Sequence, residues 1–333
     1  MKIKIALILT VLLLISCKQE ANKVEGQGLK NTKLEGSIFG TFYQVTYDSE
    51  VNYEKQFDSL FFVINKSMST YQADSDISKL NRNESNEVDK HFIKVLEASK
   101  IIYEETEGAF DPTIGALVNA WDFGPEGKIV NLDSLKIDAL MESVGFNKVS
   151  VVENKVTKQP NTFLDFNAIA KGYAVDAVAD FLSSKNVQNF LVNIGGELNA
   201  KGINIEKQSG WTVGVENPNF DGTQSWDKVF VLKDAAMATS GTYRKFKIDE
   251  NGNRYAHIID TKTGYPSKTN LLSISVIAED CMTADAYATA FKAMGIEKVK
   301  VFLKSHPELK VFLIFENENK EFETLALNDF PEN

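Results

Sequence analysis

The sequence predicts an α+β fold in which mainly antiparallel sheets are flanked by helices, in one large unit of two lobes. Segments with the composition of strands outnumber segments with helical periodicity. Most of these predicted strands follow one another through short turns, which is typical of antiparallel pairing and not of a doubly wound parallel sheet. The chain has 333 residues, of which 43% are hydrophobic, so it can bury a large core.

The first half of the chain predicts one strand followed by helices. Residues 40–47 are rich in aromatic and β-branched side chains, which are typical of a strand. In 53–68 the apolar residues Phe57, Phe61 and Ile64 recur at helical spacing, which predicts a helix with one buried face. The same periodicity predicts helices over 91–107, 114–121 and 132–144.

The second half predicts mostly short strands. Two helices are predicted in it, over 168–182 and 284–294, because apolar or small residues recur at helical spacing. A hairpin is expected to turn at Glu153 and Asn154. Strands are predicted over 149–152, 155–158, 162–166, 189–193, 211–215, 229–232, 237–239, 246–248, 271–278, 311–315 and 323–325.

Charge and missing motifs exclude several classes of function. The 36 basic and 46 acidic residues give a net charge of −10, and no basic run could neutralise a phosphate backbone, so we expect no nucleic-acid partner. The sequence lacks the glycine-rich motifs of dinucleotide-binding and P-loop proteins, and also the G-x-S-x-G and H-E-x-x-H motifs. Its histidines, His91, His257 and His306, are too widely spaced for a His-rich zinc site.

The N-terminus has the features of an export signal. Lys2 and Lys4 precede an apolar run over 5–15, which is too short to span a hydrocarbon core of about 30 Å. The run ends in Leu-Ile-Ser-Cys, which resembles a bacterial lipobox with Cys17 as the acylated residue. An ordinary signal peptide with an incidental cysteine is the alternative.

This signal predicts three parts of the chain. We expect a lipoprotein signal peptide over 1–16, a lipid-anchored tether over 17–35 and a folded domain over 36–333. Cys17 then begins the mature chain and carries diacylglycerol and palmitate. The lipid anchors the protein to a membrane of the bacterial cell envelope, where it faces the periplasm.

Two polar residues near the C-terminus point to a metal site. Asp285 and Thr289 are four residues apart in a predicted helix, so both oxygens project from one face, one turn apart. Hard oxygen ligands of this kind suit Mg²⁺ rather than zinc. The spacing alone leaves a second interpretation open, in which Asp285 complements the helix dipole and Thr289 bonds back to a carbonyl.

Further polar motifs lie next to predicted strands and helices. Asp165 and Lys171 flank the start of a predicted helix, where free backbone amides favour anions such as phosphate, although a salt-bridged cap is the alternative. Gly195 and Gly196 allow the backbone to approach a ligand closely. His257 is a candidate general base or ligand contact, or else a structural histidine.

Taken together, these segments resemble the ApbE family of FAD:protein FMN transferases, in which such motifs occur in the same order. The resemblance runs from about residue 36 to residue 325. The segments are Gly40-Thr41-Phe42, Met68-Ser69-Thr70-Tyr71, Gly108-Ala109-Phe110-Asp111-Pro112-Thr113, Trp121-Asp122-Phe123-Gly124, Leu164-Asp165, Ala170-Lys171-Gly172-Tyr173-Ala174-Val175-Asp176, Asn193-Ile194-Gly195-Gly196-Glu197, Thr239-Ser240-Gly241-Thr242-Tyr243-Arg244, His257-Ile258-Ile259-Asp260, Thr263-Gly264-Tyr265-Pro266 and Ala284-Asp285-Ala286 with Thr289.

The resemblance implies a Mg²⁺-dependent, lipid-anchored periplasmic enzyme with FAD as its substrate. Such an enzyme splits the FAD pyrophosphate and transfers the FMN phosphoryl group onto a threonine of an acceptor protein, releasing AMP. Typical acceptors are membrane subunits of the Na⁺-translocating NADH:quinone reductase (Nqr) and of the related Rnf complex. The family also has an older label as thiamine biosynthesis lipoproteins.

The resemblance also assigns roles to individual residues. Asp285 and Thr289 supply side-chain ligands to Mg²⁺, and Ala168 supplies a backbone carbonyl. Phosphoryl transfer needs such charge neutralisation more than a covalent catalyst. His257 is the candidate for activating the acceptor threonine. The flavin and adenine contacts carry over to Phe39, Tyr71, Ala109, Phe110, Asp111, Asp165 and Lys171.

Some positions depart from the family pattern, and two other functions remain open. Phe39 stands where Met is frequent, and Asp122 stands where Gly is common and adds an acid near the ligand cleft. The family usually has the sequence Asp-Pro-x-Thr-Gly in the turn from Asp260 to Gly264, and this chain departs from it at Thr261 and Lys262. An FAD pyrophosphatase would use water in place of threonine and give FMN and AMP. A non-catalytic flavin-binding lipoprotein would bind FAD without turnover.

Overall fold

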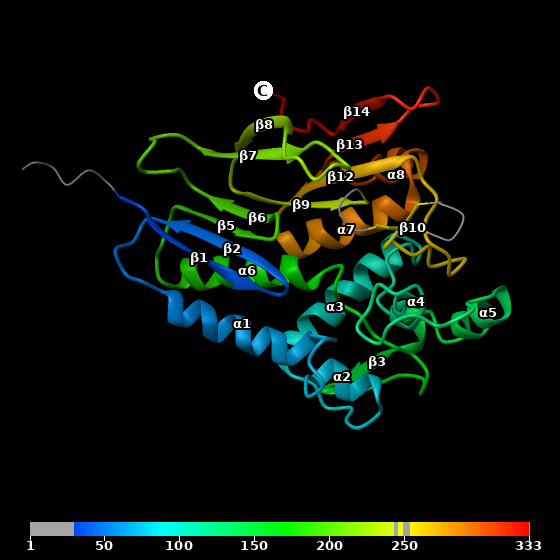
Figure 1. The fold of residues 1–333 in the computed structure, drawn as a ribbon. Coiled ribbons are helices and arrows are strands. Elements are labelled where there is room, and N and C mark those ends of the chain that lie inside the picture. Colours follow the sequence, from blue (N-terminus) through cyan, green and yellow to red (C-terminus); the bar gives the residue numbers. More distant parts are fainter. Residues whose placement is uncertain (1–29, 243–245, 249–253, 333) are drawn as a thin grey trace, which may run out of the picture.

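An eight-stranded antiparallel sheet forms the centre of the protein (Figure 1). The structure is a computed structural model, and it describes residues 30–242, 246–248 and 254–332. Helices cover the sheet, so the predicted α+β class is confirmed. In sheet order the strands are β1 (Thr32–Ile38), β2 (Thr41–Tyr47), β5 (Phe190–Ile194), β6 (Glu197–Lys201), β9 (Ala235–Gly241), β12 (Leu271–Ala278), β13 (Lys310–Glu316) and β14 (Phe322–Leu327).

The strands of this sheet follow the order of the chain, and the connections between neighbours carry the other elements. Between β2 and β5 lie α1 (Glu54–Met68), α2 (Asp76–Asn81), α3 (Lys90–Glu105), α4 (Gly115–Ala120), α5 (Ser134–Met141), a 3-10 helix (Phe146–Lys148), the hairpin of β3 (Ser150–Val152) and β4 (Lys155–Thr157), and α6 (Ala170–Ser184). Later connections hold the hairpins of β7 (Trp211–Glu216) with β8 (Trp226–Leu232) and of β10 (Phe246–Ile248) with β11 (Arg254–Ala256), and the helices α7 (Cys281–Met294) and α8 (Ile296–Phe302).

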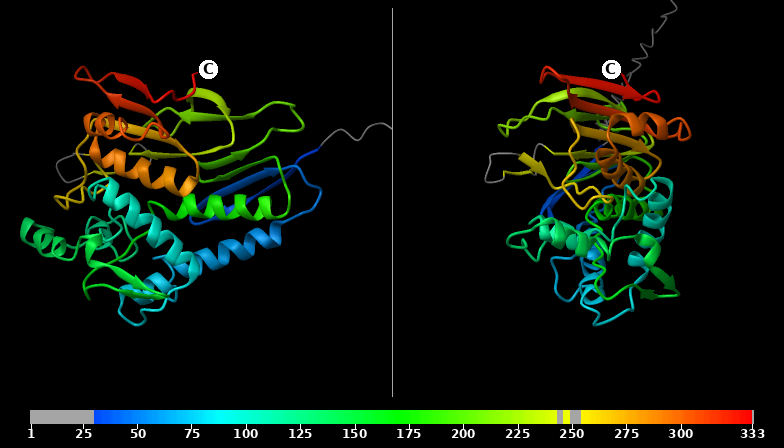
Figure 2. Two further views of the ribbon diagram at one scale, coloured as in Figure 1. Left: turned by 180° about the vertical axis from the view of Figure 1, so that it is seen from behind. Right: turned by 90° about the vertical axis from the view of Figure 1, so that its right-hand side faces the viewer.

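The two faces of the sheet pack into two different cores, because successive side chains of a strand point to opposite faces. In β9, Ala236 and Ala238 belong to the core under the helices, whereas Met237 packs with Trp211 and Phe230 of the β7–β8 hairpin. Figures 1 and 2 show α6 and α7 against one face and this hairpin over the other, with α1 and α3 beyond the two helices. The protein is therefore layered as hairpin, sheet, inner helices and outer helices.

Helices α6 and α7 cross at a glycine, and each accepts hydrogen bonds from the first turn of the other. A Cβ at Gly172 of α6 would lie 2.3 Å from the carbonyl oxygen of Cys281, so the close approach requires glycine. Asp176 of α6 accepts bonds from the amides of Cys281 (2.9 Å) and Met282 (2.8 Å) in α7. Asp285 of α7 accepts a bond from the amide of Gly172 (3.0 Å). These first-turn amides have no acceptor within their own helix.

Most predicted elements are confirmed, with bounds shifted by a few residues. The helices predicted over 53–68, 91–107, 168–182 and 284–294 correspond to α1, α3, α6 and α7. Sequence patterns do not predict β1, β6, β11, α2 or α8. Strand β1 begins at Thr32, within the segment 17–35 that was expected to be tether, and its residues alternate between exposed and half-buried. Only Leu34 and Ile38 of β1 are apolar residues that pack on the core, and two such residues give no clear hydrophobic period.

The strand predicted over 162–166 is wrong, because this segment satisfies its backbone without a partner strand. The side chain of Asn81 binds both the amide of Leu164 (2.8 Å) and its carbonyl oxygen (2.9 Å). The amide of Asp165 donates to the carbonyl of Pro112 (2.8 Å). A side chain and a loop thus provide the bonds that a strand would have supplied.

The predicted signal peptide over 1–16 and the acylated residue Cys17 lie outside the described residues. Tyr243 and Arg244 of the motif that begins at Thr239 lie outside them as well. Within the described part of the chain, no helix combines the length and apolar character needed to cross a bilayer.

Asp176→Ala is expected to lower the free energy of unfolding by about 2–3 kcal/mol, because it leaves two buried amides of α7 without acceptors. Asp180→Ala is the matched control, one turn further along α6, because the Asp180 side chain is 74% exposed. The control should change stability by less than about 0.5 kcal/mol. Urea denaturation measures both values, and equal stability of the two variants would contradict the role given to Asp176.

Candidate functional site

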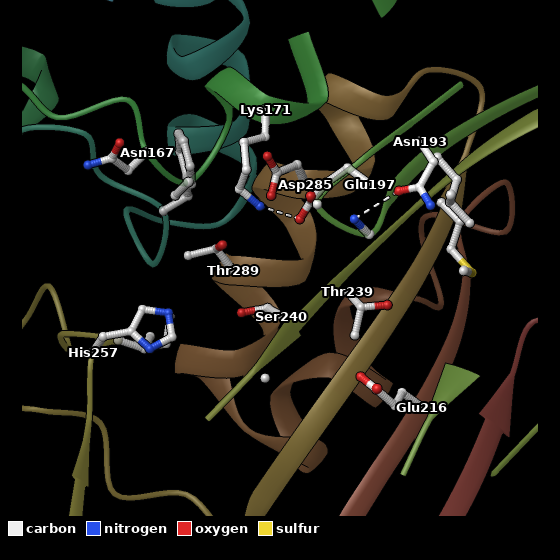
Figure 3. A pocket seen from close by; sticks show the side chains of 18 of the residues that line it. Asn167, Lys171, Asn193, Glu197, Glu216, Thr239, Ser240, His257, Asp285 and Thr289 are labelled. Carbon is white, nitrogen blue, oxygen red and sulfur yellow. Dashed lines mark hydrogen bonds and ion pairs between the residues drawn. The ribbon is translucent and has the colours of Figure 1, made fainter. Parts of the chain in front are cut away.

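A cavity of about 920 Å³ lies at one end of the sheet, where β2 and β6 begin and β5 and β9 end. Helices α6 and α7, the loop before α4 and the β7–β8 hairpin complete its walls (Figure 3). The structure therefore gathers segments that are far apart in the sequence. Nine of the predicted site residues line this cavity: Ala109, Phe110, Asp111, Asp165, Ala168, Lys171, His257, Asp285 and Thr289.

The two remaining predicted flavin contacts, Phe39 and Tyr71, line a neighbouring cavity of about 540 Å³. Phe39 has a positive φ of 51° and packs edge-on against Phe61, with 5.8 Å between the ring centroids. Tyr71 is 61% exposed, so its ring offers a plane for stacking. Asn167 and Lys171 line both cavities, which joins the two into one extended site.

One lysine and two carboxylates form a cluster where the cavity meets α6 and α7. Lys171 forms an ion pair with Glu197 through Nζ and Oε1, and Asp285 lies beside the pair (Figure 3). Burial raises the pKa of Glu197 and of Asp285, and the charge of Lys171 opposes both shifts. Burial alone would lower the pKa of Lys171, but the two carboxylates outweigh it and raise that pKa. The cluster therefore keeps a lysine cationic inside the site.

The oxygens around this cluster fit a hard cation. Two carboxylates face one lysine, and among the residues that the structure describes no donor bonds to the buried Oε2 of Glu197. Asp285 and Thr289 lie one turn apart on α7 and both line the cavity, as does Ala168. Among the residues that the structure describes, no three His, Cys, Asp and Glu side chains form a metal-binding group. The predicted set does not depend on one, because it combines a carboxylate, a hydroxyl and a backbone carbonyl, which suit Mg²⁺.

The segment before α6 is shaped by Asp165. Its Oδ1 accepts a bond from the amide of Asn167 (2.7 Å), and its Oδ2 accepts one from the side-chain amide of the same residue (3.1 Å). This turn leads into α6 and places Ala168 and Lys171 on the cavity wall. The start of α6 therefore faces the cavity, and the first turn of a helix favours bound anions.

Asp111 organises the loop before α4. Its Oδ1 accepts bonds from the amide (2.8 Å) and the hydroxyl (2.6 Å) of Thr113, and its Oδ2 accepts one from the amide of Phe146 (3.3 Å). Burial raises the pKa of Asp111, and these bonds oppose the rise. Because both carboxylate oxygens bind protein groups, a contact of Asp111 with a ligand is favoured through its backbone.

His257 follows β11 and is held by an aromatic loop after α4. Its ring lies 6.2 Å from that of Phe123. Trp121 packs on Tyr255 at 5.8 Å and donates a bond from Nε1 to the carbonyl of Gly264 (2.8 Å), so it binds the chain on both sides of His257. Figure 3 shows His257 on one side of the cavity and Glu216 on the other.

Asp122, which departs from the family pattern, pairs with Lys247 of β10. A hydrogen bond from Lys247 lowers the pKa of Asp122. The φ of Asp122 is 65°, in the left-handed region where glycine is favoured, which agrees with the glycine common at this position. The added acid is therefore engaged by a lysine and is not among the residues that line the two described cavities.

Glu197 lines the cavity and pairs with Lys171, but the sequence alone assigns no role to it. It begins β6 directly after Gly195 and Gly196, is 3% exposed and pairs with a predicted site residue. The signal available in the sequence is an acid at a strand end, placed after two glycines. Its partner Lys171 is 26 positions away, so only the fold shows that the two side chains meet.

One family model and several known proteins match nearly the whole described chain. The model of the ApbE family matches residues 39–313. A protein of Haemophilus influenzae named FAD:protein FMN transferase is 36% identical over 92% of this chain and 90% of its own length. A protein of the same name from Vibrio cholerae is 33% identical over 96% of each chain.

Two solved structures are similar at the level of the fold and of the sequence. The flavin transferase ApbE from Vibrio cholerae has a TM-score of 0.80 and 32% identity, covering 89% of this chain and 97% of its own. The flavinyl transferase ApbE from Pseudomonas stutzeri, in its apo form, has a TM-score of 0.80 and 30% identity, covering 89% of this chain and 94% of its own.

Lys171→Met is expected to lower the free energy of unfolding by about 2–4 kcal/mol, because it leaves two buried carboxylates without their counter-charge. Lys185→Met, at the exposed end of α6, is the control and should change stability by less than about 0.5 kcal/mol. Chemical denaturation in metal-free buffer compares the variants. A Lys171→Met protein as stable as the control would show that the ion pair is not needed to bury Glu197 and Asp285.

Proposed function

The chain belongs to the ApbE family and is an FAD:protein FMN transferase, and from this premise we propose how its residues transfer FMN to a threonine of the acceptor. The observation that carries the proposal is the larger cavity, which lies against the start of α6 and along one face of α7. It brings together a lysine, a histidine and a set of hard oxygens that come from separate segments. Phosphoryl transfer requires this combination of charge neutralisation and positioning.

Mg²⁺ is held in this proposal by Asp285, Thr289 and the carbonyl of Ala168. The ion, when bound, neutralises charge on the phosphates of FAD. Two observations support the assignment: two carboxylates share one lysine in the cluster, and the described residues supply no donor to the buried Oε2 of Glu197. The bond from the amide of Gly172 to Asp285 Oδ2 fixes the orientation of that carboxylate.

Lys171 and the first turn of α6 bind the pyrophosphate of FAD. The ion pair with Glu197 holds the lysine on the cavity wall, where its charge complements a phosphate. The flavin and adenine rings then extend into the two cavities that share Lys171. Tyr71 and Phe39 supply aromatic surface in the smaller cavity, and the loop around Ala109 supplies backbone in the larger one.

His257 accepts the proton of the acceptor hydroxyl. The threonine oxygen forms a bond to the phosphorus of the FMN part of FAD, and the bond from that phosphorus to the bridging oxygen breaks. The electron pair stays on the bridging oxygen, and AMP leaves with it. The contact of His257 with Phe123 and the anchoring of Tyr255 by Trp121 keep the imidazole at the cavity wall during this step.

The acceptor is an Nqr- or Rnf-type redox subunit in this proposal, and the enzyme acts in the bacterial cell envelope, where a lipid anchors it to a membrane and its folded domain faces the periplasm. Cys17 after a short apolar run supports a lipid anchor for the folded domain.

Labelled palmitate should enter the protein in cells and should not enter a Cys17→Ala variant. Labelling of that variant at the wild-type level would contradict the anchor.

The activity assay uses the full chain in detergent, FAD, Mg²⁺ and the periplasmic domain of an Nqr- or Rnf-type subunit. AMP release and the mass of the acceptor domain are followed together. An FMN adduct on a threonine, with AMP appearing only when acceptor is present, is the expected result. AMP and free FMN in the reaction without acceptor would identify a pyrophosphatase. Unchanged FAD in the reactions with and without acceptor would indicate a flavin-binding protein without turnover.

Asp285→Asn is expected to reduce Mg²⁺-dependent turnover at least about 100-fold, because an amide is a poor ligand for a hard cation but keeps the shape of the side chain. The remaining oxygen of Asn can still accept the bond from Gly172, so the fold is expected to persist. AMP release at increasing Mg²⁺ concentration measures the effect, with Asp180→Asn as the control. Retention of wild-type activity by Asp285→Asn would overturn the metal assignment.

His257→Gln is expected to reduce kcat for the acceptor about 10²–10⁴-fold, because general-base assistance is lost. The dissociation constant for FAD should stay within about threefold of wild type, since the amide fills similar space. Flavin fluorescence measures binding and acceptor mass measures turnover. An unchanged kcat would contradict the role of His257 as the base.

A further inference from the structure

The large cavity has an inner and an outer part. The inner part lies toward α6 and α7 and contains Lys171, Asp285 and Thr289. The outer part lies on the opposite face of the sheet, because Phe42 and Leu191 alternate in their strands with residues of the helix-side core. The β7–β8 hairpin contributes to this outer part with its face that points away from the sheet, because Thr212, Gly214 and Val229 alternate with side chains that pack toward the sheet. We define the outer groove by six lining residues: Phe42, Leu191, Thr212, Gly214, Trp226 and Val229.

The outer groove presents large apolar side chains to solvent. Phe42 is 44% exposed, Trp226 is 56% exposed and Val229 is 44% exposed. Exposed apolar groups that gather in one depression mark an interaction site rather than ordinary surface. Their position in the same cavity as the phosphate-binding residues connects this surface to the reaction.

The Trp226 ring packs on the backbone of its own hairpin. A Cβ on Gly214 would lie 2.6 Å from the Trp226 ring, so the indole lies directly over the backbone of β7. Val229 is paired with Gly214 across the hairpin and flanks the same position. Aromatic side chains have few rotatable bonds and lose little conformational entropy on binding, and such residues carry much of the energy of protein interfaces.

The chemistry of the outer groove favours a polypeptide over a nucleotide. The lining described for this part contains no Lys, Arg or His, whereas the inner part contains Lys171 and His257. The phosphates of FAD would therefore find no positive side chain in the outer groove. A polypeptide segment with an apolar side chain needs none, and the transfer of FMN to a protein requires such a segment to reach the inner part.

We propose that the outer groove binds the segment of the acceptor protein that carries the threonine, with an apolar side chain of that segment against Trp226 and Val229. The proposal rests on the transferase activity proposed above and names the surface that receives its protein partner. The continuity of the groove with the inner part lets one extended segment occupy the groove and present its hydroxyl toward His257.

Val229→Asp and Val231→Asp form a matched pair for the test. Both positions lie on the outward face of β8, two residues apart, and Val231 is 50% exposed but is not among the residues that line the cavity. Either substitution places the same charge on the same strand, so a general effect on the hairpin should appear in both. Trp226→Ala is the third variant and removes the aromatic anchor.

Three quantities are measured for each full-length variant: the dissociation constant of the acceptor domain used in the activity assay, its KM, and the dissociation constant of FAD. Val229→Asp and Trp226→Ala should raise the first two at least tenfold and leave FAD binding within twofold of wild type. Val231→Asp should leave all three within twofold. Unchanged acceptor binding in Val229→Asp and Trp226→Ala would overturn the proposal. A tenfold loss of FAD binding in these two variants would overturn it as well, because it would place FAD in the groove.

Acceptor binding is measured without turnover, so the two proposals fail separately. A wild-type protein that binds the acceptor domain through this groove but releases no AMP would contradict the proposed function. A wild-type protein that flavinylates the domain with no dependence on Trp226 or Val229 would contradict the docking surface alone.

Discussion

The crossing of α6 and α7 is the constraint on which the site depends. Each helix carries an aspartate in its second turn that accepts first-turn amides of the other, and Gly172 allows the two backbones to come this close. The starts of both helices are thereby fixed beside each other, and both carry partial positive charge. Asp285 therefore has two roles, because it secures α6 and also faces the cavity beside Lys171.

The sheet brings the other parts of the site to this crossing. Its strands follow chain order, and each long connection returns to the next strand with one component of the site. The connection from β2 to β5 brings the loop with Asp111 and the lysine of α6, and the connection from β9 to β12 brings His257. The connection from β6 to β9 brings the hairpin that contributes to the outer part of the cavity. The connections between neighbouring strands thus supply most of the site residues. Such connections can vary in sequence and length while the sheet itself is kept.

The sequence predicts the fold where periodicity is strong and the site where motifs are ordered. Amphipathic helices such as α1 and α3 and apolar strands such as β12 are recognisable because one face is buried. The residues around 162–166 are not, since Asn81 replaces a strand partner through a contact over 83 positions. Glu197 is not identified from the sequence for the same reason, because its partner Lys171 comes close to it only in the folded chain. The spacing of Asp285 and Thr289 gives their common face, but the second carboxylate that meets Asp285 at Lys171 comes from Glu197 and is brought there only by the fold.

We propose that the helix crossing holds both the metal and the pyrophosphate of FAD. Crystals grown with FAD and with Mn²⁺ in place of Mg²⁺, measured at a wavelength where manganese scatters anomalously, would locate the ion. We expect an anomalous peak bounded by the Asp285 carboxylate, the Thr289 hydroxyl and the Ala168 carbonyl, with the FAD phosphates against it and against Lys171. A peak at other protein ligands, or phosphates bound away from the start of α6, would rule out this placement.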